Sequence, residues 1–168
     1  MTESALALVA CDAGPVIHLN ELGRLGLLSS FAKVLIPTAV WLEVQRHRPT
    51  ALELRCLERT SAATPEPPER ESIALALNLH TGEWEAIRAA MEHHSSTLLT
   101  DDTAARLAAN NLGVRVHSTI GILVRSVRQG HRSKAEVLGI LSAIPTSSTL
   151  HLKRSLLDVA IAQVADGA

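Results

Sequence analysis

The fold is decided by the stretch Leu6-Ala7-Leu8-Val9-Ala10-Cys11-Asp12-Ala13-Gly14-Pro15-Val16-Ile17-His18-Leu19. Its first six residues are evenly apolar, which predicts a short strand buried on both faces rather than an amphipathic helix. Asp12 ends this strand, Pro15 suits the first turn of a helix, and the apolar residues that follow recur at helical spacing. A buried strand followed at once by a helix is typical of an α/β fold with a parallel sheet.

The rest of the chain continues this alternation of short apolar strands and helices. Further strands are predicted at 34–36, 97–100 and 114–116. Helices are predicted at 16–22, 25–31, 39–46, 51–59, 69–79, 83–93, 102–111, 120–129, 133–143 and 150–164. The alternation predicts a three-layer α/β/α fold with a central, mainly parallel sheet. The Pro-rich stretch 60–68 is interpreted as a surface loop, so residues 1–168 are expected to form a single domain with a C-terminal helical segment from about residue 133.

Composition restricts the class of protein further. Hydrophobic residues make up 46% of the 168 residues and aromatic residues only 2%, so the core must be built from Leu, Ala, Val and Ile. The two cysteines, Cys11 and Cys56, indicate neither a disulfide framework nor a zinc site. No run of 18 apolar residues occurs, so we expect a cytoplasmic protein without a membrane partner. The net charge of −1 does not indicate a globally basic nucleic-acid binder.

Acidic residues stand where predicted strands end or helices begin: Asp12, Glu43, Glu83 and the pair Asp101–Asp102. Carboxylates at the ends of buried strands are costly to desolvate unless they face a crevice or a cation. In open parallel sheets that crevice is where ligands bind, and converging carboxylates suit a hard divalent ion. Each acid taken alone is more simply interpreted as a helix cap or as a partner of the helix dipole. Their number at one sheet edge favours a metal site.

Several segments, in order along the chain, resemble the PIN-domain proteins of the prokaryotic branch related to VapC-type toxins. These segments are Cys11–Leu19, Ile36–Val44, Thr81–Ile87, Leu98–Arg106 and Ser118–Leu123. The resemblance implies a PIN-like fold and a ribonuclease that hydrolyses RNA phosphodiesters with Mg²⁺ or Mn²⁺ as its cofactor. The catalytic and metal-binding acids that it implies are Asp12, Glu43, Glu83 and one of Asp101 and Asp102. It further implies a toxin role, a small antitoxin protein as partner and a homodimer.

The sequence departs from the family pattern at two positions. Ala13 stands where many PIN domains have Ser or Thr, which removes a hydroxyl beside Asp12. His117 stands where Gly often precedes Ser or Thr. The acids themselves are intact, so the departures leave the predicted metal-binding set complete.

Other polar residues near these segments have more than one interpretation. Thr119 could orient an acid or a substrate phosphate, or cap its helix. Arg106 could reach a phosphate, but an ion pair with Asp102 four residues earlier is favoured. Two basic groups could guide an RNA backbone, although a solvated helix face is the simpler interpretation of each. These groups are Arg46-His47-Arg48 and the later set Arg125, Arg128, His131, Arg132 and Lys134.

Two other classes of function stay open at this point. A catalytically inactive PIN-like module that binds nucleic acid or protein would have the same fold, and the intact acids argue against it. A phospho-acceptor signalling domain also places acids at strand ends. That class needs an early acidic pair and a late lysine, whereas Asp12 stands alone and no lysine ends the last predicted strand.

Overall fold

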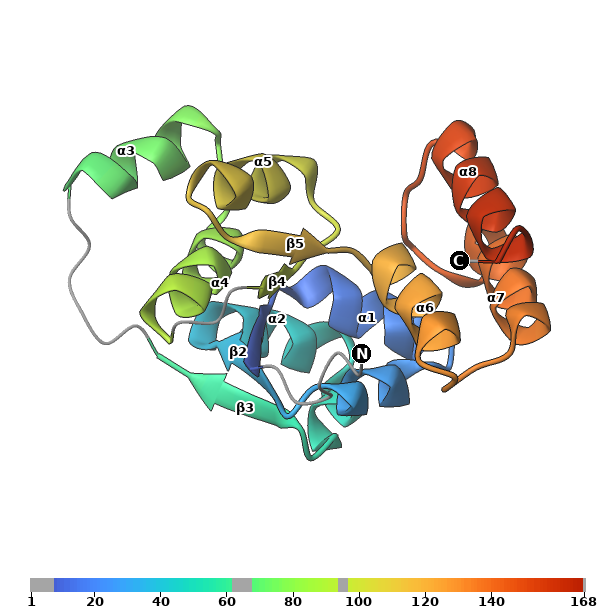
Figure 1. Cartoon of the computed structure of the whole chain (residues 1–168). Coiled ribbons are helices and arrows are strands. Elements are labelled where there is room, and N and C mark those ends of the chain that lie inside the picture. Colours follow the sequence, from blue (N-terminus) through green and yellow to red (C-terminus); the bar gives the residue numbers. More distant parts are fainter. Residues whose placement is uncertain (1–7, 62–67, 94–96, 168) are drawn as a thin grey trace.

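The computed structural model describes residues 8–61, 68–93 and 97–167. Within these ranges the strands form one sheet that is parallel throughout, in the order β3-β2-β1-β4-β5. The strands are β1 (Leu8–Cys11), β2 (Lys33–Pro37), β3 (Leu57–Thr60), β4 (Thr97–Leu99) and β5 (Arg115–His117). Helices cover both faces of the sheet, as Figure 1 shows, so the predicted three-layer α/β/α fold is confirmed.

The helices follow the strands closely along the chain. They are α1 (Ala13–Glu21), α2 (Thr38–His47), α3 (Pro68–Ala76), α4 (Thr81–Glu92), α5 (Thr103–Asn111), α6 (Thr119–Arg128), α7 (Lys134–Ser147) and α8 (Arg154–Ala165). Short 3₁₀ turns occupy Leu25–Ser30 and Pro49–Glu53. None of the helices in the described ranges combines the length and the hydropathy of a membrane span.

Each face of the sheet has its own buried cluster. Successive residues of a strand point to opposite faces, and β1 follows this rule. Val9 and Cys11 pack in the cluster that contains side chains of α1, α2 and α6, whereas Ala10 packs with α4 and α5. Because β1 is buried on both faces, its unbroken apolar sequence is explained.

The predicted helix over 51–59 is wrong. Leu57–Thr60 forms β3, which pairs in parallel with β2 at the edge of the sheet, and only Pro49–Glu53 is helical, as a 3₁₀ turn. The local sequence is rich in good helix formers, so its propensity points to the wrong element. Pairing with β2 overrides that weak preference, because it gives backbone N–H and C=O groups of Leu57–Thr60 hydrogen-bond partners in β2. Residues 62–67, most of the predicted loop, lie outside the described residues.

The C-terminal helices α7 and α8 pack against each other and against α6 (Figure 1). Their buried side chains belong to the same cluster as those of β1 and α1. Leu141 and Ile144 of α7 and Leu157 and Val164 of α8 are at most 5% exposed. The helical segment after residue 133 therefore extends the core of one sheet face.

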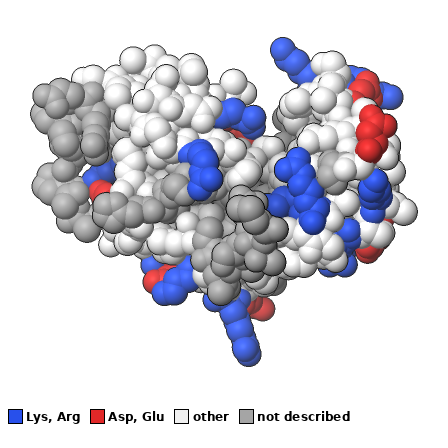
Figure 2. Space-filling view, in the orientation of Figure 1, with Lys and Arg blue, Asp and Glu red and all other residues white. Residues whose placement is uncertain are grey.

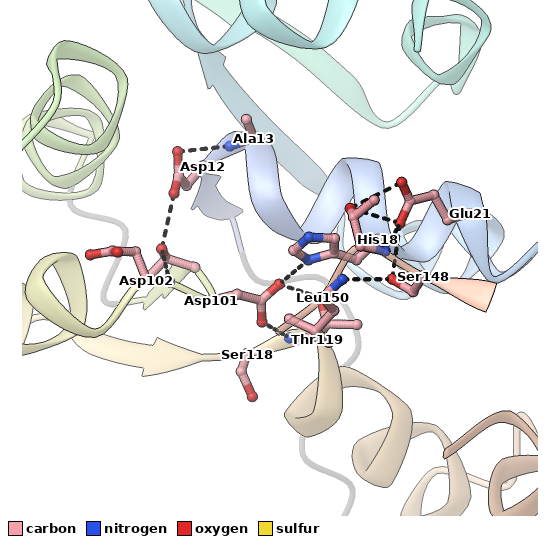
Figure 3. A network of polar contacts seen from close by, with 12 residues as sticks. Asp12, Ala13, His18, Glu21, Asp101, Asp102, Ser118, Thr119, Ser148 and Leu150 are labelled. Atoms are coloured by element: carbon pink, nitrogen blue, oxygen red, sulfur yellow. Dashed lines mark hydrogen bonds and ion pairs between the residues drawn. The ribbon is translucent and has the colours of Figure 1, made fainter. Parts of the chain in front are cut away.

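Glu21 fastens this helical segment to the rest of the fold. Its carboxylate accepts hydrogen bonds from Ser148 Oγ at 2.9 Å and Thr149 N at 2.7 Å, both in the link between α7 and α8 (Figure 3). It also pairs with Arg48 Nη2 at 3.0 Å, and its side chain is only 7% exposed. Burial raises the pKa of Glu21, but the hydrogen bonds from Thr149 and Ser148 outweigh this and hold the pKa below its ordinary value of 4.5.

We expect Glu21→Gln to lower the free energy of unfolding by about 1.5–3 kcal/mol at pH 7, the range for hydrogen bonds to a charged group. Because the pKa in the folded state is lowered, this contribution is present above the unfolded value of 4.5 and is lost as the pH falls below it. Urea unfolding of both proteins at pH 7 and near pH 3.5 measures it. Glu58→Gln, which removes the exposed ion pair with Lys33, is the control with an expected effect below about 1 kcal/mol. A Glu21→Gln effect that is equal at both pH values would contradict the prediction.

Candidate active-site cleft

A cleft lies at the carboxyl edge of the sheet, beside the end of β1. The strand order reverses between β1 and β4, and ligands of parallel α/β folds bind outside the carboxyl ends of the strands at such a point. The cleft has a volume of about 730 Å³ and is lined by Asp12, Ala13, Gly14, Ala39, Leu42, Glu43, Arg46, His47, His80, Thr81, Gly82 and Glu83. That volume is in the range of about 300–1,000 Å³ that ligand sites occupy.

One face of α2 forms a wall of the cleft. The α2 residues that line it are Ala39, Leu42, Glu43, Arg46 and His47, whose spacing of three and four places them on one side of the helix. The opposite wall is the first turn of α4. A Cβ atom on Gly82 would lie 3.3 Å from Val40 Cγ2 and 3.7 Å from Glu43 Oε2. The glycine therefore lets the start of α4 approach α2 closely.

Asp12 lies where β1 meets α1, and its orientation is fixed. It is 7% exposed, its Oδ1 accepts from Ala13 N at 2.7 Å, and its Oδ2 accepts from Thr100 Oγ1 at 3.0 Å. Burial raises its pKa from 3.8 to about 7, with smaller contributions from the charges of Glu83 and Glu43, against the lowering effect of the two hydrogen bonds. Asp12 is thus a buried acid that its acidic neighbours disfavour as an anion.

Glu43 and Glu83 face the cleft from its two walls. Glu43 is exposed on α2, and Glu83 is half-buried in the first turn of α4. Glu83 Oε2 accepts a hydrogen bond from His80 N at 2.9 Å, which ties it to the start of its helix. Burial raises the pKa of Glu83, and the charges of Asp102 and Glu43 raise it further. The acids of the cleft therefore act on one another electrostatically.

The adjacent aspartates Asp101 and Asp102 have different partners (Figure 3). Asp101 Oδ1 accepts from Thr119 N at 2.7 Å, and its Oδ2 accepts from Thr119 Oγ1 at 2.6 Å and from His18 Nδ1 at 2.8 Å. Both oxygens of Asp101 are therefore occupied, and Asp101 does not line the cleft. Asp101 thereby holds the start of α6 against α1. Of the two roles predicted for Thr119, the one observed is the orientation of an acid. The cap of α6 is Ser118, whose Oγ accepts from Gly121 N.

Asp102 caps α5 and is linked to Asp12 through Thr100. Its Oδ1 accepts from Ala105 N at 2.7 Å, and its own N donates to Thr100 Oγ1 at 3.2 Å. Thr100 is fully buried and donates to Asp12 in turn. Like Asp101, Asp102 does not line the cleft, but its charge contributes to the raised pKa of Glu83, after the larger effect of burial. Thr100 is a site residue that the sequence analysis missed, and its only signal is a hydroxyl directly before the acidic pair.

The predicted ion pair between Arg106 and Asp102 is wrong. Arg106 is exposed and forms no ion pair within the described part of the chain; its backbone N donates to Asp102 O at 3.1 Å. The carboxylate of Asp102 turns to the first turn of α5 to accept from Ala105 N, so it does not meet a guanidinium one turn further along the helix.

The side chains that line the cleft are of the kind that binds a hard divalent cation, although they do not form a complete set of ligands around one point. Among the described residues no group of three His, Cys, Asp or Glu side chains could hold an ion in this conformation. The cleft nevertheless offers carboxylates of Asp12, Glu43 and Glu83, and the pKa of Asp12 is raised chiefly by burial and to a smaller extent by the charges of Glu83 and Glu43. A cation would relieve this repulsion, and oxygen ligands are those that Mg²⁺ and Mn²⁺ prefer. These acids and Asp102 are the residues that would hold it.

Comparisons with known proteins place the fold in a family. A family model described as a PIN domain (DUF3368) matches residues 8–166. A solved structure, a PilT N-terminus domain protein of the hyperthermophilic archaeon Sulfolobus solfataricus P2, is similar with a TM-score of 0.55 and 21% sequence identity, covering 71% of this chain and 93% of that chain. No curated protein matches significantly. The extent of the family match, together with the parallel sheet and the acidic cleft, shows that this chain belongs to the PIN-domain family.

Proposed function

We propose that this protein is a metal-dependent endoribonuclease that hydrolyses RNA phosphodiesters. PIN domains are generally nucleases, and this chain belongs to that family. The observation that carries the proposal is the meeting of Asp12, Glu43 and Glu83, from three separate elements, in one cleft at the point where the strand order reverses.

The residues of the cleft divide the work of hydrolysis between them. A bound Mg²⁺ or Mn²⁺ would lower the pKa of water and neutralise charge that develops on a phosphoryl oxygen. Asp12 is the rigid member, since Ala13 and Thr100 hold both of its oxygens. Glu43 and Glu83 flank the substrate from the two walls. Glu83, which the bond from His80 N ties to the first turn of α4, would be one of the carboxylates that hold the cation.

The biological setting that we propose follows the resemblance to the branch related to VapC-type toxins. In it the protein is the cytoplasmic toxin of a toxin–antitoxin pair, is inhibited by a small antitoxin protein and acts as a homodimer. The second candidate is a PIN-like module that binds nucleic acid or protein without turnover. The absence of a ready-made ligand group among the described residues favours this alternative, whereas the intact acids favour the enzyme.

Cleavage of end-labelled RNA tests the proposal. The purified protein is expected to cut single-stranded or structured RNA in Mg²⁺ or Mn²⁺, to stop in EDTA and to recover when excess metal is added. Activity that survives EDTA would belong to a contaminant or to another mechanism. If calorimetry shows that metal binds while no RNA is cut, the non-catalytic module becomes the better description.

A further inference from the structure

The two basic groups of the sequence have different surroundings in the structure. In the later group, the Arg125 guanidinium lies 4.6 Å from the centroid of the Phe31 ring and donates to Ser30 Oγ, and Arg132 pairs with Glu136. On the face seen in Figure 2, acidic side chains lie among the Lys and Arg side chains over the C-terminal helices. The later group therefore contributes to packing and does not form an uninterrupted basic stripe.

The earlier group borders the cleft. Arg48 is occupied by Glu21, but Arg46 and His47 line the cleft from the last turn of α2, and both are exposed. Arg46 forms no hydrogen bond or ion pair through its side chain within the described ranges, although carboxylates line the same cleft. A guanidinium of this kind is free to bind an anion, and its planar fork matches a phosphate.

The position of Arg46 relative to the acids defines which phosphate it can meet. Arg46 follows Glu43 by three residues on the same helix face, a displacement of about 4.5 Å along the helix axis at 1.5 Å per residue. On this wall Glu43 lies about one helical turn before the guanidinium of Arg46. An RNA strand that lay along α2 with one phosphate beside Glu43 would bring a neighbouring phosphate to Arg46.

We infer that Arg46 binds the RNA backbone at a phosphate next to the one that is cleaved, with His47 beside it. This inference rests on the proposed function and deepens it. A phosphate contact positions the strand without reading its bases, so Arg46 gives affinity that does not depend on sequence. Since the flanking phosphate does not change during the reaction, the contact stabilises the bound substrate and the transition state equally and lowers KM without raising kcat.

Arg46→Gln tests the inference against Arg128→Gln, a matched control. Both arginines are exposed and lie in the last turn of a helix, where the helix dipole stabilises a positive charge. Arg128, however, does not line the cleft. Binding of a fluorescent single-stranded RNA is followed by anisotropy in EDTA, where no cleavage is expected. We expect Arg46→Gln to weaken binding about tenfold at low salt and to reduce the slope of log K against log salt by about 0.7, the share of one phosphate contact on a single strand. Arg128→Gln should match the wild type, and Arg46→Lys should keep the slope.

Steady-state cleavage in Mg²⁺ or Mn²⁺ gives the second measurement. Arg46→Gln should raise KM about tenfold and change kcat less than about twofold, the pattern of lost uniform binding. Unchanged RNA affinity and salt slope in Arg46→Gln would overturn the inference, as would a fall in kcat at constant KM. If the wild type binds RNA but does not cut it, the nuclease proposal fails, while the binding difference between the two variants still supports Arg46 as the phosphate contact. If the wild type binds no RNA, both fail.

Discussion

Asp12→Asn is expected to reduce RNA cleavage by about 10²–10³-fold or more, the scale on which a group that stabilises transition-state charge contributes. Asp12 lies at the floor of the cleft, and hydrogen bonds from Ala13 and Thr100 fix both of its oxygens. Asparagine keeps the size of the side chain and removes its charge, so binding of the cation should weaken while the fold is preserved. Initial rates with labelled RNA, and calorimetric titration of the same samples with Mn²⁺, measure the two effects.

The same substitution should leave the metal-free protein as stable as the wild type or more stable. Burial raises the pKa of Asp12 from 3.8 to about 7, so the folded state holds its proton more tightly than the unfolded state does. Ionisation of Asp12 therefore lowers the free energy of unfolding of the wild type. This loss is absent below pH 3.8, grows as the pH rises to about 7 and is complete above that pH. Asparagine removes this effect and is also a good N-cap.

Thermal unfolding in EDTA from pH 4 to pH 8 checks this expectation. The midpoint of Asp12→Asn should equal that of the wild type near pH 4 and exceed it by up to about 10 °C at pH 8. A pKa raised from 3.8 to about 7 corresponds to about 4 kcal/mol at most, and about 1 kcal/mol shifts the midpoint of a chain of this size by about 2–4 °C. Asp158→Asn, on the exposed face of α8, serves as the control. A large fall in the midpoint at pH 8 would mean that the charge of Asp12 serves the fold rather than a cation.

The parts of the fold that the sequence predicts correctly are those with strong local signals. The unbroken apolar run of β1, buried on both faces, has no helical alternative of that length, and the helix predicted over 120–129 is α6 (Thr119–Arg128). β3 could not be predicted from its own residues, because they favour a helix and only the pairing with β2 makes this segment a strand. Such pairing is a property of the assembled sheet, which a window of sequence does not contain.

The candidate site shows the same division between local and long-range information. Asp12 and the pair Asp101–Asp102 follow predicted strands directly, and neighbouring parallel strands end on the same side of a sheet, so the sequence places these acids at one edge. It does not say which aspartate turns to the cleft. That depends on Thr119 and His18, which lie 18 and 83 residues from Asp101 in the sequence. That Arg46 has no ion-pair partner among the residues the structure describes depends in the same way on the position of α2 relative to distant acids.

Asp101→Asn and Asp102→Asn should therefore differ: the first should lower mainly stability and the second mainly activity. Asp101→Asn loses a charge that binds Thr119 and His18 in a part-buried setting. We therefore expect the free energy of unfolding to fall by about 1.5–3 kcal/mol, the range for hydrogen bonds to charged groups. Cleavage assayed below its midpoint should stay within about tenfold of the wild type, because Asp101 does not line the cleft and contributes by holding α6 in place.

Asp102→Asn should retain stability within about 0.5 kcal/mol, because asparagine caps a helix as well as aspartate does and can still accept from Ala105 N. Its cleavage should fall about 10²-fold or more if Asp102 is one of the acids that hold the cation, because both of its carboxylate oxygens lie outside the Thr119 and His18 bonds that occupy Asp101. Urea unfolding and initial cleavage rates on the same three proteins give both comparisons. If Asp101→Asn instead lost activity at unchanged stability while Asp102→Asn stayed active, Asp101 would be the acid that serves the cation, and its bonds to Thr119 and His18 would have to open when the metal binds.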